Sequence, residues 1–392
     1  MSIKFKTIYY AYASIMAIKL SFYFDGASRY ISLRATIALS IFCFLFFIIN
    51  KIKIQSRNLI LAIIYISISF LFILVWSVSE EMIVTEQCKQ LLEFIFPLLI
   101  IINVWTLTRN LSVEETIKGL FYFVYVSLVL ISVDTLIRLL MPSYAFKGNE
   151  GEFAIELARD TYYIYKYGSI MYLDSNYVAM QILLVIGLLI INTHRYKKKL
   201  ILFSILLLFL TFSRAAYIGL VAIFLLYVTR KVNKKSKTLV MGLYFTLILI
   251  PLIYFAVFHS EFNGLLVDQS LASKVTIFSS LKKITDIELV NLFFGSGFDI
   301  GGYIFSYKEG GYAHAFIPLV LGEIGLVGLI SICIILFAVY VELKKDSPYI
   351  LLPYVLCGFS LIYPYDSMYI LIFFSMLIAN KKCQKLECSN GK

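Results

Sequence analysis

The chain has 392 residues, of which 60% are apolar and only 15% are charged, with a mean hydropathy of +0.86. The apolar residues form repeated blocks of about 17–22, the length that crosses a bilayer core of about 30 Å. This composition excludes a soluble globular protein and predicts a polytopic membrane protein. The net charge of +11 then reflects membrane orientation rather than binding to nucleic acid.

We expect an all-α integral membrane protein with about twelve transmembrane helices, forming a single membrane domain over residues 1–392. A basic start followed by an apolar stretch resembles a secretory signal, but Lys19 interrupts the stretch and no cleavage site follows, so a membrane helix is favoured. The predicted spans are 7–24, 30–50, 58–77, 90–107, 117–140, 175–192, 197–211, 214–230, 238–258, 313–340, 349–363 and 366–380.

The basic residues predict the orientation of these spans. With the N-terminus inside, the short inner segments hold 22 of the 35 Lys and Arg, as the positive-inside rule requires. Both termini then lie inside, with a tail at 381–392, and the two longest loops, 141–174 and 259–312, lie outside. The six cysteines and three histidines show no metal-ligand spacing, so no metal or cofactor is expected.

Several polar residues lie at the outer ends of the early spans. Lys89 enters the fourth span with Glu93 one turn later, and Arg138 follows Asp134 at the end of the fifth. Each pair could simply neutralise itself. Together with Lys19 and Arg34, these residues still leave excess positive charge near the outer leaflet. That excess predicts an anionic ligand such as a phosphate or pyrophosphate.

The first long outer loop combines Arg159 with many tyrosines in "RDTYYIYKYGSIMY". Aromatic faces beside polar groups suit a sugar, although a tyrosine belt at the membrane interface has the same composition. The loop ends in Asp174, Ser175 and Asn176. The plainer interpretation of these three is a helix N-cap, and the functional alternative is that Asn176 binds substrate.

Arg214 lies in the tight turn "TFSR" between two spans, at the outer surface. It could be a snorkelling arginine at a helix end, with its head group in water. Arginine is disfavoured on the outer side, and the N-terminus of the following helix favours an anion, so we expect Arg214 to bind one.

The segment "GGYAHAFIPLVLGEIGLVGLI" carries His314 near the membrane edge and Glu323 deeper in the tenth span. A neutral imidazole there could accept a proton from a hydroxyl, or could be wetted by headgroups. In a continuous helix, Glu323 would face away from His314, so Glu323 is expected to pair with another helix, hold a loop or bind substrate. Glycines at 322, 325 and 328 predict close helix packing.

At these residues the chain resembles the superfamily of O-antigen polymerases (Wzy) and O-antigen ligases (WaaL). The matching elements are "TFSRAAYIGL", "DSNYVAM", "GSGFDIGG" and "AHAFIPLVLGEIGLVGL", and their order and shared outer location carry the likeness. One departure is Ala315, where the family has a small polar residue.

The resemblance implies a GT-C-like, metal-independent, inverting glycosyltransferase of the bacterial inner membrane, with its site and two large loops facing the periplasm. The implied substrate is a glycan on undecaprenyl pyrophosphate, and a polysaccharide chain-length regulator is a further expected partner besides membrane lipids. A polymerase transfers the glycan to another lipid-linked repeat unit, and this is the favoured function. A ligase transferring it to lipid A–core and a lipid-linked oligosaccharide flippase are the alternatives.

By hypothesis, Arg214 and His314 are the catalytic residues of this enzyme. Arg214 stabilises the pyrophosphate, and His314 orients or deprotonates the attacking hydroxyl. The further substrate-binding candidates are Lys89, Arg138, Arg159, Asn176 and Glu323.

Overall fold

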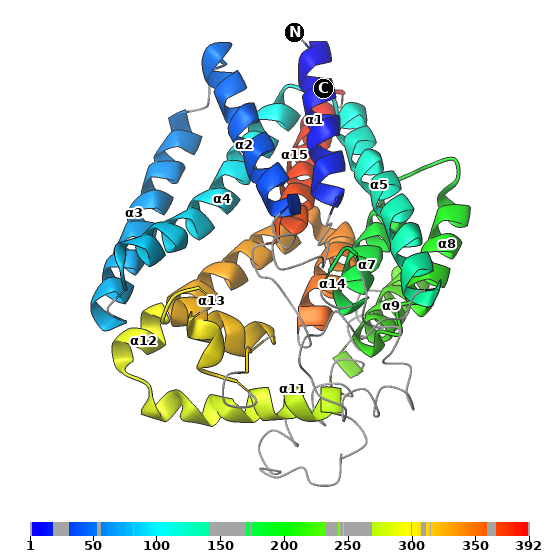
Figure 1. Ribbon diagram of the computed structural model, residues 1–392. Coiled ribbons are helices and arrows are strands. Elements are labelled where there is room, and N and C mark those ends of the chain that lie inside the picture. The colour runs from blue at the N-terminus through cyan, green and yellow to red at the C-terminus, as the bar shows by residue number, and fades with distance from the viewer. Residues whose placement is uncertain are drawn as a thin grey trace.

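The computed structural model is helical, with no strands, in the part of the chain that it describes (Figure 1). That part comprises residues 2–18, 31–52, 56–80, 82–140, 170–172, 175–231, 242–243, 246, 269–298, 300–306, 311–313, 315–358 and 366–390. The helices are α1 (Ser2–Ala17), α2 (Ile31–Ile49), α3 (Ser56–Ser79), α4 (Val84–Arg109), α5 (Val113–Leu140), α7 (Ser175–Ile191), α8 (Lys197–Phe209), α9 (Arg214–Val228), α11 (Gln269–Ser279), α12 (Leu289–Phe294), α13 (Phe316–Leu343), α14 (Pro348–Gly358) and α15 (Ser367–Asn390), with short 3-10 segments η4 (Thr229–Lys231), η5 (Ser280–Asp286), η6 (Ile300–Tyr303) and η7 (Lys344–Asp346).

Four of these helices are long and apolar enough to cross a membrane, namely α4, α5, α13 and the Ile60–Ser79 part of α3. In α3 and α13, only 28% of the most apolar stretch is buried inside the molecule. Leu74 and Val78 of α3, for example, are 63% and 83% exposed. Exposed apolar surface on this scale suits hydrocarbon rather than water, so the chain is a membrane protein.

Helices α11 and α12 lie in the stretch 259–312 that was predicted as a loop, and each other helix lies at about the position of a predicted span. The span at 238–258 lies almost entirely outside the described residues. Four shorter apolar stretches, each of 10–17 residues, lie at Thr36–Ile49 within α2, at Ser175–Ile191, at Arg214–Val228 and at Pro348–Gly358. The number twelve and the GT-C likeness therefore stay predictions. Most of the loop at 141–174 also lies outside the described residues, whereas much of the loop at 259–312 is described.

Helix α7 forms the centre of the main apolar core. It is apolar all round and almost every residue in it is buried, which is the pattern of a helix enclosed by others. It packs against α5, α8, α9 and α14. Gly187 permits the closest of these approaches, because a Cβ there would lie 2.2 Å from the carbonyl oxygen of Tyr349 in α14. Helix α7 is thereby fixed among four other helices.

The two termini lie at the same end of the molecule, at the top of Figure 1. There, Lys6 of α1 forms a salt bridge of 3.7 Å with Glu115 at the start of α5. Lys382 of α15 donates hydrogen bonds to the carbonyl oxygens of Thr108, Arg109 and Leu111, which end α4. A cation at the C-terminal end of a helix is favourable because the last carbonyls carry partial negative charge.

Residues of other predicted inner connections also lie near one another. Lys197, which begins α8, lies close enough to Arg230 and Asp346 to interact with their charges. Asn380 of α15 donates a hydrogen bond of 2.7 Å to the carbonyl oxygen of Glu342 near the end of α13. The connections that the charge pattern assigns to one side of the membrane therefore neighbour one another in space.

Candidate functional site

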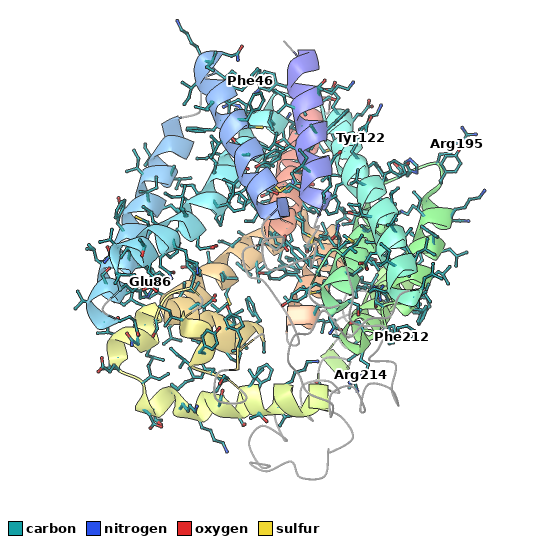
Figure 2. All side chains as sticks on the ribbon, viewed as in Figure 1. Phe46, Glu86, Tyr122, Arg195, Phe212 and Arg214 are labelled. Atoms are coloured by element: carbon teal, nitrogen blue, oxygen red, sulfur yellow. The ribbon has the colours of Figure 1, made fainter. Side chains whose placement is uncertain are left out.

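The turn between α8 and α9 presents Arg214 as the first residue of a helix. Phe212 has a positive φ of 53°, which reverses the chain within three residues. Ser213 is the N-cap of α9, and its hydroxyl accepts a hydrogen bond of 3.4 Å from the amide of Ala216. The Arg214 side chain is exposed, whereas Ser213 beside it is buried. Figure 2 shows Phe212 and Arg214 in the lower half of the molecule, away from the termini.

Two other helices hold this turn in place. The hydroxyl of Ser175, the first residue of α7, donates a hydrogen bond of 2.7 Å to the carbonyl oxygen of Thr211. Nη1 of Arg138 in α5 donates a bond of 3.3 Å to the carbonyl oxygen of Leu210. Asn176, next to Ser175, is largely buried. The structure therefore brings the predicted "DSN" and "SR" elements together at one place.

Arg138 requires a correction to the predicted set of ligand-binding residues. Its side chain is 0% exposed, and its Nε donates a bond of 2.9 Å to Asp134. The second carboxylate oxygen of Asp134 accepts from the amide of Ile170 at 2.8 Å. A guanidinium enclosed in this way has no surface with which to bind substrate. Arg138 and Asp134 instead join α5, the end of the first long loop and the turn before Arg214.

Lys89 lies in a different part of the structure from Arg214. It is exposed near the start of α4, a helix that packs against α1, α2, α3 and α15, whereas α9 packs against α7, α8 and α14. Figure 2 shows Glu86, one turn before Lys89, on the opposite flank from Arg214. The predicted pairing of Lys89 with Arg214 around one pyrophosphate therefore gains no support from their positions.

Helix α13 is broken at Gly325, whose φ of 63° and ψ of −166° are not helical. The break leaves the carbonyl oxygens of Gly322 and Glu323 available to the loop before the helix. They accept hydrogen bonds of 2.8 and 3.0 Å from the amides of Ser296 and Gly297. Of the glycines predicted to allow close helix packing, Gly322 contacts the loop at Gly301, whereas Gly325 lies against Phe293 of helix α12.

Glu323 also requires a correction, since its carboxylate holds the same loop. It is 6% exposed, and its Oε1 accepts a hydrogen bond of 2.7 Å from the hydroxyl of Tyr312. Tyr312 lies two residues before His314 in the chain. Glu323 therefore fixes the segment that leads to His314, which agrees with the predicted alternative that it holds a loop. The alternative that Glu323 binds substrate gains no support.

Helices α3 and α4 hold the other side of this loop. Nε1 of Trp76 donates a hydrogen bond of 2.9 Å to the carbonyl oxygen of Phe294. The amide group of Gln90 bonds both to the carbonyl oxygen of Phe298, at 2.9 Å, and to its N–H, at 2.8 Å. The described part of the second long loop is thus a fixed structure. His314 and Arg159 themselves lie outside the described residues, so their predicted roles stay predictions.

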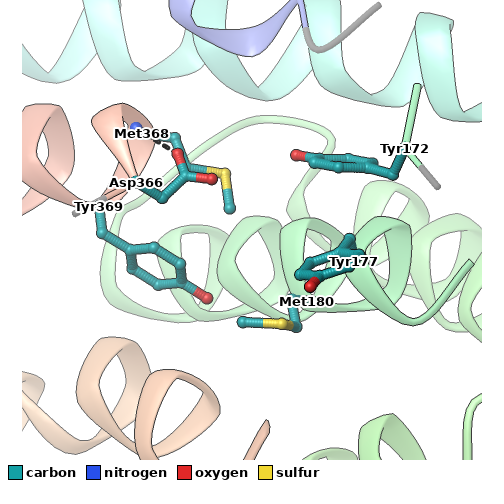
Figure 3. A pocket seen from close by; sticks show the side chains of 6 residues that line it. All are labelled: Tyr172, Tyr177, Met180, Asp366, Met368 and Tyr369. Carbon is teal, nitrogen blue, oxygen red and sulfur yellow. Dashed lines mark hydrogen bonds between the residues drawn. The ribbon is translucent and has the colours of Figure 1, made fainter. Parts of the chain in front are cut away.

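A small pocket opens between the start of α7 and the start of α15 (Figure 3). The rings of Tyr172 and Tyr177 stack at 5.7 Å with an interplanar angle of 22°. Burial, and next the charge of Asp366, raises the pKa of the Tyr172 hydroxyl well above its ordinary value, so it stays protonated and donates to Gln181. The pocket is lined by Tyr172, Tyr177, Met180, Asp366, Met368 and Tyr369.

The sequence prediction missed Asp366, although a signal was present. The stretch "PYDSMY" places an acidic residue and a serine at the start of the last apolar span, which is an N-cap pattern. The structure shows that cap, because Oδ1 of Asp366 accepts a hydrogen bond of 2.9 Å from the amide of Met368. Among the described residues there is no group of three or more His, Cys, Asp and Glu that could hold a metal ion.

Comparison of the chain with models of known protein families found no matching family, and comparison with curated proteins found no match. The likeness to the polymerase and ligase superfamily therefore rests on the short motifs alone.

Proposed function

We propose that the chain is a membrane glycosyltransferase, a polysaccharide polymerase that transfers a glycan from undecaprenyl pyrophosphate to another lipid-linked repeat unit. The proposal includes twelve membrane spans in a GT-C-like arrangement. It also includes an inner-membrane location with both termini in the cytoplasm. Contacts among the basic connections, at the end of the molecule with the termini, support that orientation.

The observation that carries the proposal is the setting of Arg214. An exposed guanidinium stands at the N-terminus of α9, where the helix dipole also favours an anion. Buried groups from α5 and α7 hold the turn, so little reorganisation is needed when a charge arrives. A planar guanidinium binds phosphate oxygens with two parallel hydrogen bonds, which suits a pyrophosphate leaving group.

In the proposed reaction, the bond between the sugar's anomeric carbon and the pyrophosphate oxygen breaks as the acceptor hydroxyl attacks from the opposite face. Arg214 stabilises the negative charge that develops on the departing pyrophosphate. His314 accepts the proton of the attacking hydroxyl, and the anomeric configuration inverts. Arg159 remains a candidate second ligand of the pyrophosphate, whereas buried Arg138 is withdrawn from that role.

The test is complementation of a strain that lacks the gene, with lipopolysaccharide analysed by gel. A polymerase defect leaves core carrying one repeat unit, and wild type restores the ladder. We expect Arg214→Ala to abolish the ladder and Arg214→Lys to shorten it, because lysine keeps the charge without the bidentate geometry. Arg195→Ala is the matched control, since Arg195 is exposed in the upper half of the molecule (Figure 2). A normal ladder with Arg214→Ala at normal expression contradicts the proposal.

The same gel separates the alternatives. Loss of a ligase leaves bare core while glycan stays on its lipid carrier, and loss of a flippase stops glycan from reaching the outer face at all. The motifs of polymerases and ligases are shared, so either of these outcomes replaces the polymerase assignment.

A further inference from the structure

The hydroxyl of Tyr369 is one of several buried hydroxyls that have no hydrogen-bond partner among the described residues. Tyr369 in α15 is 2% exposed, and its hydroxyl forms no hydrogen bond. Buried polar groups are normally paired, so an unpaired one calls for a ligand or an ordered water. Figure 3 shows the ring of Tyr369 at the edge of the pocket with its hydroxyl directed into it.

The rest of the pocket offers a consistent chemistry. Asp366 supplies a carboxylate, which accepts hydrogen bonds, and the Tyr369 hydroxyl both donates and accepts. The stacked rings of Tyr172 and Tyr177, with Met180 and Met368, form apolar walls beside these two groups. These groups suit a ligand that carries a hydroxyl beside C–H groups. The ligand hydroxyl would lie between Asp366 and Tyr369, and its C–H groups would pack against the apolar walls.

Other ligand classes fit less well. None of the six described residues that line the pocket is a Lys, Arg or His, and the carboxylate of Asp366 repels an anion, so these residues do not favour a phosphate. The enclosed space takes a single small group rather than a whole sugar ring.

We infer that this pocket is a carbohydrate subsite, in which one hydroxyl of the glycan binds between Asp366 and Tyr369. The inference rests on the proposed function. Ser175, at the start of α7, links the helix that carries Tyr177 and Met180 to the turn before Arg214. In this arrangement the cation of Arg214 binds the pyrophosphate. The anion of Asp366, on a neighbouring element, binds the glycan.

The test uses Tyr369→Phe, which removes only the unpaired hydroxyl and so breaks no hydrogen bond among the described residues. Tyr349→Phe is the matched control, because the Tyr349 hydroxyl in α14 is also buried and unpaired but does not line the pocket. Binding to the purified full chain in nanodiscs is measured with two probes. One is undecaprenyl pyrophosphate, and the other is the oligosaccharide released by mild acid from lipid-linked repeat units of the deletion strain.

We expect Tyr369→Phe to bind the oligosaccharide about 5- to 10-fold more weakly, the effect of one lost hydrogen bond, and undecaprenyl pyrophosphate as wild type does. Tyr349→Phe should match wild type with both probes, and neither variant should lower the melting temperature. Equal oligosaccharide binding by the two variants overturns the inference and leaves the proposed function intact. If wild type binds neither probe, the proposed function fails with it.

Discussion

Gly325 offers a sharp test of the broken helix, through the substitution Gly325→Ala. Its φ of 63° and ψ of −166° fall in a region of backbone conformation that only glycine adopts without strain. A Cβ at this position would also lie 2.4 Å from the carbonyl carbon and oxygen of Phe293. Because those are backbone atoms of α12, no side-chain rotation can relieve the contact.

The size of the effect follows from two contributions. A non-glycine residue in this conformation costs about 1–3 kcal/mol. Contacts under 3.0 Å essentially never occur for a Cβ, so α12 and α13 must separate by several tenths of an ångström. Overpacking of this kind costs a further 1–3 kcal/mol or so. We therefore expect Gly325→Ala to lose about 2–6 kcal/mol, unless the helix straightens and releases the loop.

The measurement is the apparent melting temperature in detergent, followed by gel filtration of heated samples, together with hydrogen exchange of the Ser296 and Gly297 amides. Both amides should exchange faster, because their acceptors are the carbonyl oxygens of Gly322 and Glu323 beside the break. Gly242→Ala is the control, since a Cβ there meets nothing within 4 Å. If Gly325→Ala has the same apparent melting temperature as Gly242→Ala, and hydrogen exchange of the Ser296 and Gly297 amides is unchanged, the reasoning about the break is refuted.

Two further predictions concern buried polar groups. Arg138→Met should cost about 3–5 kcal/mol by leaving the Asp134 carboxylate without its cation, and Asp134→Asn in the same chain should recover most of that loss. A double variant as unstable as the single one contradicts this. Gln90→Leu should cost roughly 2–6 kcal/mol, because the N–H and carbonyl of Phe298 both lose this buried partner. Hydrogen exchange at Phe298 should rise, and unchanged exchange there contradicts the assigned bonds.

The class of the protein and the positions of its helices could be predicted from the sequence. Hydropathy and span length are local properties, so each predicted span other than 238–258, which lies almost entirely outside the described residues, contains a helix at about the predicted place. The N-cap at Ser213 was equally local, since it depends on a serine at the start of an apolar run. The pairing of Asp134 with Arg138 followed from their spacing of one helical turn.

The tertiary structure decided which groups surround the polar side chains of Arg138 and Glu323. Arg138 is buried because α5 packs where the turn before Arg214 ends, and no local pattern contains that contact. Glu323 binds Tyr312 only because Gly325 breaks the helix, whereas a continuous helix was the natural expectation.

The pocket depends on the same kind of long-range contact, since it joins Tyr172 to Tyr369 across about half of the chain. In a soluble protein an apolar face marks the inside, but in a bilayer both the lipid-facing and the core-facing sides of a helix are apolar. The sequence of a membrane protein therefore determines where its helices lie along the chain. Packing among distant helices decides which polar side chains are enclosed and which are presented to a substrate.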